Sequence, residues 1–279
     1  MNRLLDRLDV PAPLLWIDAD DYCERLLANG RAPWTDAAAW LAWQRKGQGL
    51  LRSDVVALPV ARMIDAWLAA QPTVRSTMGL KNRLLLPLRT LLANEALRAH
   101  LLEMIVGLRA SQGSTPIVLV MPSPRAWVAI AYRQAFEAGS ANEAEPEVTA
   151  DDADSAAVYI ADFLRAFGES GLDGVLLVES AGTVPGSDDD LSCYGAVFNL
   201  AAHYRWACGI ELPKTGGFDA STLDFVISSE VQTGVRRHGH RIAWQSETDH
   251  AAHFSFVTVP ANGEPEQVLD RLRRLRASA

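Results

Sequence analysis

The sequence contains eight short runs of consecutive apolar residues, most of them separated by stretches with helical periodicity. Parallel strands that are covered on both faces are typically continuous apolar runs, and helices connect one such strand to the next. Eight strands of this kind close a (β/α)₈ barrel. We therefore predict an α/β fold, a single (β/α)₈ TIM-type barrel over residues 1–279. The predicted strands are 14–17, 55–58, 117–120, 175–178, 207–210, 225–227, 242–244 and 254–257.

The stretches between the strands predict helices and two loop insertions. Thr35 and Asp36 are suited to cap a helix that continues toward residue 50, and further helices are expected at 59–69, 91–108, 155–168 and from about 264 onward. Residues 140–154 are rich in Ala, Glu and Asp and predict an acidic loop. A second acidic loop is expected at 181–192. Neither has the character of a domain linker.

Composition and charge argue against several classes of partner. The net charge is −8, and the one basic cluster, residues 236–241, has no interleaved aromatic residues, so no nucleic-acid partner is expected. No apolar run approaches the ~20 residues of a membrane span, and the first residues lack a signal-peptide pattern. The three cysteines are widely scattered, which is typical of a reducing compartment. We predict a cytoplasmic protein with no membrane association.

Three common catalytic motifs are absent from the sequence. No G-x-G-x-x-G follows a predicted strand, and neither G-x-x-x-x-G-K-[ST] nor G-x-S-x-G occurs. These absences argue against dinucleotide oxidoreductases, P-loop enzymes and serine hydrolases.

One block of the sequence resembles a known family. Residues 149–182 form an amphipathic helix, a glycine turn and a strand that ends in Glu179, Ser180, Ala181 and Gly182. This block resembles the uroporphyrinogen decarboxylase superfamily, in which a similar strand leads to a D-S-W-A-G-like sequence. Residues 108–127, 49–67 and 265–269 are more loosely similar to its G-G-P-F-T-like, F-S-D-I and P-E-N-V-like segments. The resemblance implies a (β/α)₈ barrel, the fold of porphyrinogen decarboxylases, corrinoid methyltransferases and cobalamin-independent methionine synthases.

The chain also departs from that family at its best-known functional positions. It has no M-R-Q-A-G-R motif, and the place of the F-S-D-I aspartate holds no carboxylate. The acidic chain also lacks a basic cluster for a polycarboxylate, which argues against uroporphyrinogen decarboxylase itself. The nearest match to the H-x-C-G-like zinc motif is 206–209, where Trp206 replaces the histidine and no cysteine follows Cys208. If a divalent metal is bound, the candidate ligands are Glu179, Cys208 and His250.

Catalytic residues of such barrels come from the C-terminal ends of the strands, which selects Glu179, Asp18 and Arg62. Glu179 ends an apolar run, so it is either an acid–base group with a raised pKa or a structural carboxylate that accepts backbone N–H bonds. Asp18 and Asp20 form an acid–base pair, unless Asp20 or Asp21 caps the next helix. Arg62 clamps a substrate carboxylate, or it forms a salt bridge.

The same rule selects substrate-binding candidates. Arg125 is a second candidate clamp, Ser180 follows Glu179, and Trp16 either packs in the core or lines the barrel mouth. Gln245 and His250 belong to the polar segment 245–253, which either binds a metal ion, moves protons or is an ordinary loop. His238 and His240 are expected before the seventh strand, on the opposite face.

Three functions remain open at this level. The first is an enzyme that acts on a small, carboxylate-bearing organic acid by decarboxylation or related proton chemistry. The second is a methyltransferase that exchanges a methyl group with a folate, a thiol or a corrinoid protein. The third is a non-catalytic barrel subunit that binds a partner protein. A homodimer is compatible with all three.

Overall fold

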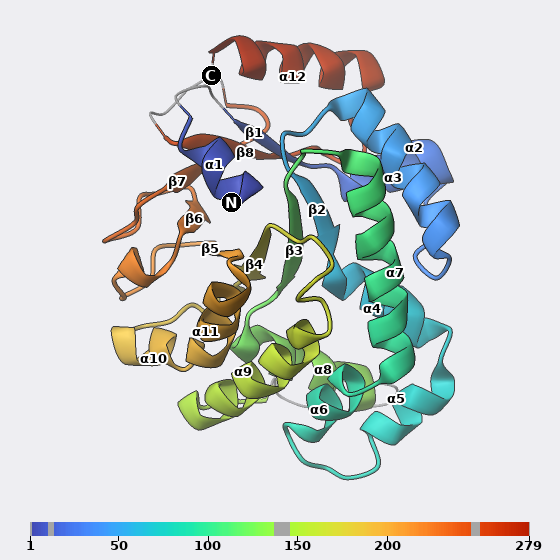
Figure 1. The fold of residues 1–279 in the computed structure, drawn as a ribbon, viewed down its shortest axis with the longest axis vertical. Coiled ribbons are helices and arrows are strands. Elements are labelled where there is room, and N and C mark those ends of the chain that lie inside the picture. Colours follow the sequence, from blue (N-terminus) through green and yellow to red (C-terminus); the bar gives the residue numbers. More distant parts are fainter. Residues whose placement is uncertain (1, 11–13, 137–145, 247–251, 279) are drawn as a thin grey trace.

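The fold is a nearly closed barrel of eight parallel strands (Figure 1). The computed structural model describes residues 2–10, 14–136, 146–246 and 252–278. The hydrogen-bonded strand order is β1-β8-β7-β6-β5-β4-β3-β2, so each strand from β2 onward pairs with the next one in the chain. The strands are β1 (Leu15–Asp18), β2 (Val56–Pro59), β3 (Ile117–Pro122), β4 (Gly174–Val178), β5 (Ala207–Glu211), β6 (Phe225–Ser228), β7 (His238–Ile242) and β8 (Phe254–Thr258). The predicted (β/α)₈ TIM-type barrel is confirmed.

The barrel has a seam between β1 and β2, which do not pair as strands. Side chains from the turn before β2 accept hydrogen bonds that a neighbouring strand would otherwise accept from β1. The backbone N–H of Leu15 donates to Asp54 at 2.8 Å, and that of Ile17 donates to Ser53 Oγ at 2.9 Å. These bonds satisfy the exposed edge of β1, because a buried N–H without a partner would be costly.

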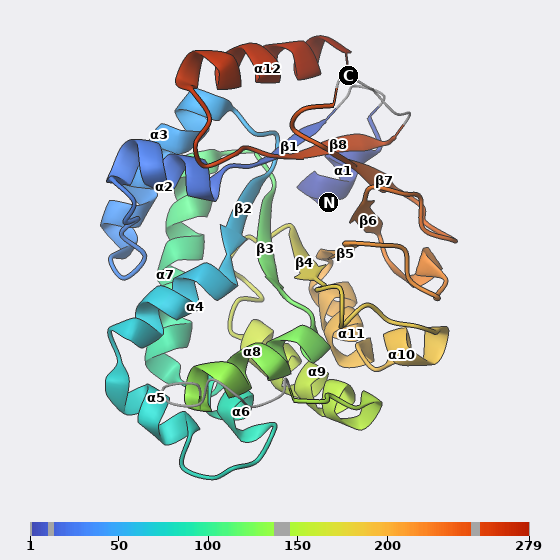
Figure 2. The same ribbon diagram turned by 180° about the vertical axis from the view of Figure 1, so that it is seen from behind.

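Large apolar side chains fill the inside of the barrel. Trp16, Val118, Leu176, Phe225 and Phe254 are all at most 2% exposed and belong to one cluster. This cluster continues into α1 (Arg3–Leu8), whose Leu4 and Leu8 pack against the same residues. In Figure 1, α1 lies in front of the strands. In the opposite view of Figure 2, it lies behind them. The helix therefore closes the barrel at one end.

An ion pair holds α1 in place. Buried Asp173, just before β4, accepts from Arg3 at 3.1 Å and from Arg109 at 3.0 Å. It also accepts from the backbone N–H of Ile117 at 2.9 Å. Because this carboxylate is 3% exposed, its partners compensate the cost of removing it from water.

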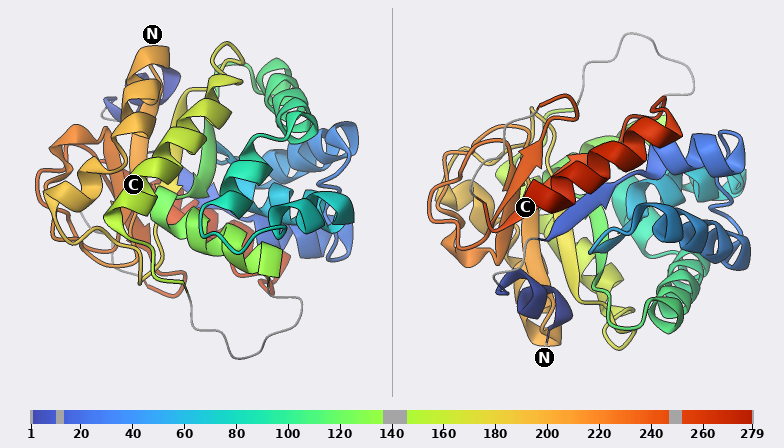
Figure 3. Two further views of the ribbon diagram at one scale, coloured as in Figure 1. Left: turned by 90° about the horizontal axis from the view of Figure 1, so that it is seen from below. Right: turned by 90° about the horizontal axis from the view of Figure 1, so that it is seen from above.

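Helices cover most of the outer face of the sheet. A larger cluster of buried apolar residues lies between the strands and these helices. The helices after α1 are α2 (Asp20–Ala28), α3 (Ala37–Leu51), α4 (Val60–Ala69), α5 (Pro72–Met78), α6 (Leu86–Leu92), α7 (Glu95–Gln112), α8 (Pro124–Phe136), α9 (Ala150–Arg165), α10 (Asp188–Ser192), α11 (Gly195–Tyr204) and α12 (Pro265–Ser278). Figure 3 shows α12 lying along β8 and β1. None of the described helices spans enough apolar residues to cross a membrane.

The part of the chain between β5 and β8 departs from the regular alternation of strand and helix. Its described residues contain one short 3₁₀ turn, η1 (Ala220–Thr222), and no α-helix. Loops cover the outer face of β6 and β7 instead, and Ser228 and His238 are still at most 5% exposed there.

Several sequence predictions of local structure are wrong. The seventh strand is His238–Ile242 rather than 242–244, so His238 and His240 lie in the strand instead of before it. The helix expected at 155–168 begins at Ala150, inside the predicted acidic loop. A capping box explains this early start, because Thr149 and Asp152 bond reciprocally to each other's backbone N–H groups. The second predicted loop contains α10, which Ser187 caps.

Candidate active site at the barrel mouth

A cavity of about 290 Å³ opens at the end of the barrel where the strands terminate. Inward-facing positions of six strands, β1 to β5 and β8, line it, together with the first turns of α2 and α4. In a barrel of this type, this is the face on which catalytic residues gather. The lining residues are Trp16, Asp18, Asp20, Asp21, Ala57, Pro59, Arg62, Val120, Leu176, Val178, Glu211 and Phe256.

Asp18 and Asp20 are two of the four carboxyl-bearing residues that line this cavity. Asp18 is the last residue of β1, and Asp20 is the first residue of α2. The backbone N–H of Asp20 donates to the Asp18 carboxylate. Thr258 Oγ1 at the end of β8 also donates to it, at 3.3 Å. The N-cap residue of α2 is Ala19, and no side chain caps the helix, so neither Asp20 nor Asp21 serves as its cap.

The two carboxyl groups differ in how readily they hold a proton. Burial raises the pKa of Asp20 to about 7, and the nearby negative charge of Asp18 adds to this effect. Burial also raises the pKa of Asp18, but the hydrogen bonds from Asp20 and Thr258 oppose the shift. A carboxyl group with a pKa near 7 exchanges a proton readily at neutral pH, which suits general acid–base catalysis.

The arginine side chains at the mouth already have acidic partners. Arg62 on α4 donates to Asp21 and lies 3.7 Å from Glu24. Arg241 on β7 donates to Glu211, the last residue of β5, at 2.5 Å. Burial raises the pKa of Glu211, whereas Arg241 opposes that rise. Within the described residues, neither Asp18 nor Asp20 has an arginine or lysine partner of this kind.

The floor of the cavity is aromatic. Trp16 and Phe256 line it, and their ring centroids are 6.0 Å apart in an edge-to-face arrangement. The guanidinium of Arg241 lies 5.5 Å from the centroid of the Phe256 ring. An aromatic face carries partial negative charge, so the Phe256 ring stabilises this guanidinium, which itself does not line the cavity.

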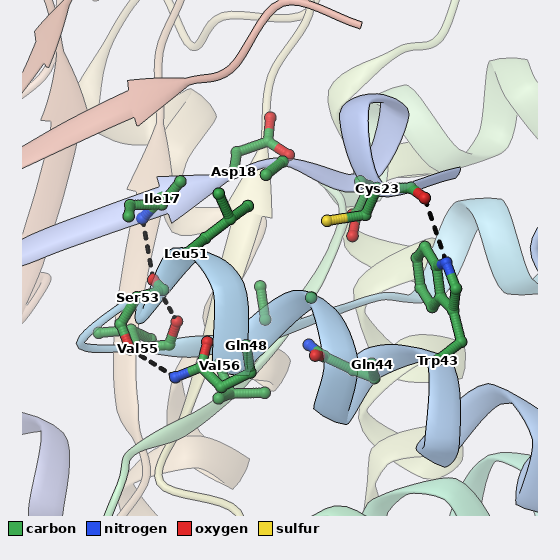
Figure 4. Close-up of a pocket in the computed structure, with 14 residues that line it drawn as sticks. Ile17, Asp18, Cys23, Trp43, Gln44, Gln48, Leu51, Ser53, Val55 and Val56 are labelled. Carbon is green, nitrogen blue, oxygen red and sulfur yellow. Dashed lines mark hydrogen bonds between the residues drawn. The ribbon is translucent and has the colours of Figure 1, made fainter. Parts of the chain in front are cut away.

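A second, narrower hollow of about 50 Å³ lies at the seam between β1 and β2 (Figure 4). Asp18 and Asp20 line this hollow as well as the mouth cavity. On the far side, Gln44 of α3 extends its amide toward it and Cys23 presents its sulfur. The hollow has room for a few water molecules. The two aspartates therefore separate a substrate-sized cavity from a space of solvent size.

Glu179, a predicted catalytic residue, lies outside the mouth cavity. Side chains alternate along a strand, and because Leu176 and Val178 face the cavity, Glu179 points the other way. Its carboxylate accepts hydrogen bonds from Ser123 at 2.7 Å, from Tyr194 at 2.7 Å and from Thr183. Burial raises the pKa of Glu179, and these three hydroxyl groups oppose the rise. Glu179 thus joins the ends of β3 and β4 to α11.

The other predicted residues lie at the mouth, on its rim or outside the described residues. Asp18, Arg62 and Trp16 line the cavity as expected of site residues. Arg125 forms a salt bridge of 3.0 Å with Asp190 in the second predicted acidic loop. Exposed Ser180 contacts Thr183, and Gln245 lies in an exposed turn after β7. His250 lies outside the described residues.

The residues present do not fit a zinc centre of the family's type. Cys208 is buried among the apolar residues outside the barrel, and burial raises the pKa of its thiol to about 12. A metal-binding cysteine must be a thiolate, which this environment strongly disfavours. Glu179 lies in its hydroxyl cluster, away from Cys208. Among the described residues, no group of three or more His, Cys, Asp or Glu side chains is arranged to hold a metal ion.

Sequence reasoning missed two residues of the mouth, Glu211 and Arg241. Glu211 ends an apolar run just as Glu179 does, and this similarity was the available signal. The two differ in the direction of their side chains, because Glu211 occupies an inward-facing position of its strand and Glu179 an outward-facing one. Arg241 was missed because the seventh strand was placed too late in the sequence.

Comparison with known proteins supports the fold and gives no family. No family model matches the sequence, and no curated protein matches it. A solved structure described as a methyltransferase from Methanosarcina mazei is similar, with a TM-score of 0.56 and 14% sequence identity. The similarity covers 99% of this chain and 97% of that one. The barrel architecture is therefore shared over the whole length of both chains.

Proposed function

We propose that the protein is a methyltransferase whose substrates meet at the barrel mouth, beside Asp18 and Asp20. The proposal rests on the position of Asp20, whose pKa is raised to about 7, in the wall of a cavity large enough for a ligand. Methyl transfer to an acceptor such as a thiol forms a bond from the acceptor to the methyl carbon, and the acceptor loses its proton. A carboxylate with a pKa of about 7 accepts that proton at neutral pH.

The neighbouring groups support this role for Asp20. Asp18 receives two hydrogen bonds, which stabilise its ionised form. The pair therefore takes up one proton, and Asp20 is the group that holds it. The apolar walls, including Val120 and Val178, offer a methyl group a surface against which it packs without losing hydrogen bonds. The structural similarity to a methyltransferase is consistent with the proposal.

The test is a transfer assay with isotopically labelled methyl donors. Methylated amines, sulfonium compounds, methyltetrahydrofolate and methylcobalamin are each incubated with the purified protein and a simple thiol, and the methyl thioether is measured by mass spectrometry. We expect transfer from at least one donor class, reduced roughly 100-fold or more by Asp20→Asn. Asp270→Asn, which changes an exposed carboxylate on α12, is the matched control. Absence of transfer from every class would contradict the proposal.

A second candidate function is decarboxylation of a small organic acid, which the position of Arg62 favours. Arg62 lines the same cavity as Asp20, so it would hold a carboxylate while Asp20 protonates the carbon that loses CO₂. This requires Arg62 to exchange Asp21 for the substrate. Release of CO₂ from a panel of small acids, abolished by Arg62→Gln, would favour this function over methyl transfer.

A further inference from the structure

Acidic side chains outnumber basic ones around the mouth cavity. The cavity wall and the direct partners of its arginines contain five carboxyl groups, those of Asp18, Asp20, Asp21, Glu24 and Glu211. Among the described residues at the mouth, two guanidinium groups, those of Arg62 and Arg241, oppose them. Each arginine is already bonded to a carboxylate that is not Asp18 or Asp20. An anionic substrate would have to compete for these arginines. A cation would meet two aspartates that form no salt bridge among the described residues, although the charge of Arg62 acts on both and opposes the rise that burial causes in their pKa values.

The apolar part of the same cavity also favours a cation, of a particular kind. Trp16 and Phe256 form the floor, and Phe256 already stabilises the guanidinium of Arg241. The remaining walls are aliphatic and offer no hydrogen-bond acceptors from their side chains, as in Val120, Leu176 and Val178. A cation with methyl groups in place of N–H bonds meets such walls without leaving donors unpaired.

We infer that the mouth cavity binds a methylated onium cation, a quaternary ammonium or a sulfonium, as the methyl donor. This inference rests on the proposed function and names its substrate class. The positive centre lies against Asp18 and Asp20, and the methyl groups lie over Trp16 and the aliphatic walls. The bond from the onium centre to one methyl carbon breaks, and its electron pair stays on the leaving amine or thioether, which becomes neutral. The acceptor thiol forms the new carbon–sulfur bond and gives its proton to Asp20.

The two charges that disappear in this step balance each other. The onium cation becomes neutral as the donor leaves, and the carboxylate of Asp20 becomes neutral as it takes the proton. The transfer therefore leaves the net charge of the cavity unchanged, which avoids the cost of creating an unpaired charge there. The aromatic floor contributes to binding the donor and loses its attraction for the neutral product.

The test is calorimetric binding of three probes of similar shape. Tetramethylammonium represents an ammonium donor, trimethylsulfonium represents a sulfonium donor, and 2,2-dimethylpropan-1-ol is a neutral analogue. We expect at least one cation to bind roughly tenfold or more tightly than the alcohol, and Asp20→Asn and Asp18→Asn each to weaken that binding by a similar factor. The tighter of the two cations identifies the source class. Asp270→Asn, on the exposed surface of α12, leaves the affinity unchanged.

Proton release gives a second readout that a structural role for Asp20 would not produce. A cation beside Asp20 favours its charged form, so binding near pH 7 expels a proton, which titrations in buffers of different ionisation enthalpy detect. We expect this release in the wild-type protein and its loss in Asp20→Asn. Equal binding of the alcohol, or no binding of either cation, overturns the inference. Methyl transfer from a neutral donor without cation binding would overturn it while leaving the proposed function intact. Cation binding without any transfer would uphold the binding site and refute the methyltransferase.

Discussion

The backbone N–H of Asp20 donates to the carboxylate of Asp18, so the two acids of the barrel mouth differ in proton affinity although they share one cavity. The bond stabilises the charge of Asp18, and that charge in turn favours the protonated form of Asp20. Position in the fold produces this asymmetry, because Asp18 ends a strand and Asp20 opens the following helix. The predictions below follow from it and from the bonds that support the barrel.

The stability of the protein is expected to depend on the protonation of Asp20. Its pKa is raised in the folded state from 3.8 to about 7, so folding is favoured when Asp20 holds its proton. This contribution is fully present below pH 3.8 and is lost as the pH rises through about 7. Asp20→Asn removes the dependence, and we expect it to stabilise the fold by about 2–4 kcal/mol at pH 8 relative to its effect at pH 4. Urea unfolding of both proteins at the two pH values measures the difference. A difference that stays constant with pH would contradict the assignment.

Replacement of Glu179 is expected to act on the fold. Glu179→Gln replaces one acceptor oxygen by an amide that cannot accept from Ser123, Thr183 and Tyr194 together. We expect a loss of about 1–3 kcal/mol in unfolding free energy. Tyr194→Phe, which removes one of the three donors, should cost less. A fully stable Glu179→Gln protein that has lost all turnover would instead assign catalysis to Glu179.

The ion pair of Arg241 and Glu211 is expected to support the mouth. Arg241→Met removes the partner that opposes the rise in the pKa of Glu211, so this carboxyl group should titrate at a higher pH in the variant. The pH at which Glu211 titrates is measurable by carboxyl NMR. The double variant Arg241→Met/Glu211→Gln should recover part of the lost stability, because it leaves no unpaired charge. Equal stability of the single and double variants would argue against coupling.

The closure of the barrel by α1 is expected to depend on Asp173. Asp173→Asn weakens the bonds to Arg3 and Arg109 and leaves the partly buried guanidinium of Arg109 without its counter-charge, at a cost of about 2–3 kcal/mol. Asp162→Asn is the matched control, since its bond to Arg98 is largely exposed and should contribute about 0–1 kcal/mol. Urea denaturation compares the two variants. Equal effects would show that Asp173 has no special role.

Sequence reasoning found the barrel because its signal is repeated and local. Apolar runs such as those of β3 and β4 are continuous, since both faces of each strand are buried. The strand β7 carries His238, His240 and Arg241 instead, and loops rather than helices cover its outer face. A polar strand of this kind contains no apolar run. The seventh strand was therefore predicted at the next apolar residues, 242–244.

The site was only partly accessible from sequence for a different reason. The rule that strand ends carry catalytic residues selected Asp18 and Arg62, and both line the mouth cavity. It cannot by itself distinguish Glu179 from Glu211, because the inward or outward direction depends on the register of each strand in the barrel. The raised pKa of Asp20 depends on burial and on the proximity of Asp18, which only the folded chain establishes.

The most direct test of the central claim is a carbon NMR titration of the Asp20 carboxyl group, assigned by comparison with Asp20→Asn. The account predicts a midpoint near 7, because burial and Asp18 both favour the protonated form. It also predicts that tetramethylammonium lowers this midpoint. A midpoint near the ordinary aspartate value of 3.8, unaffected by the cation, would contradict the account.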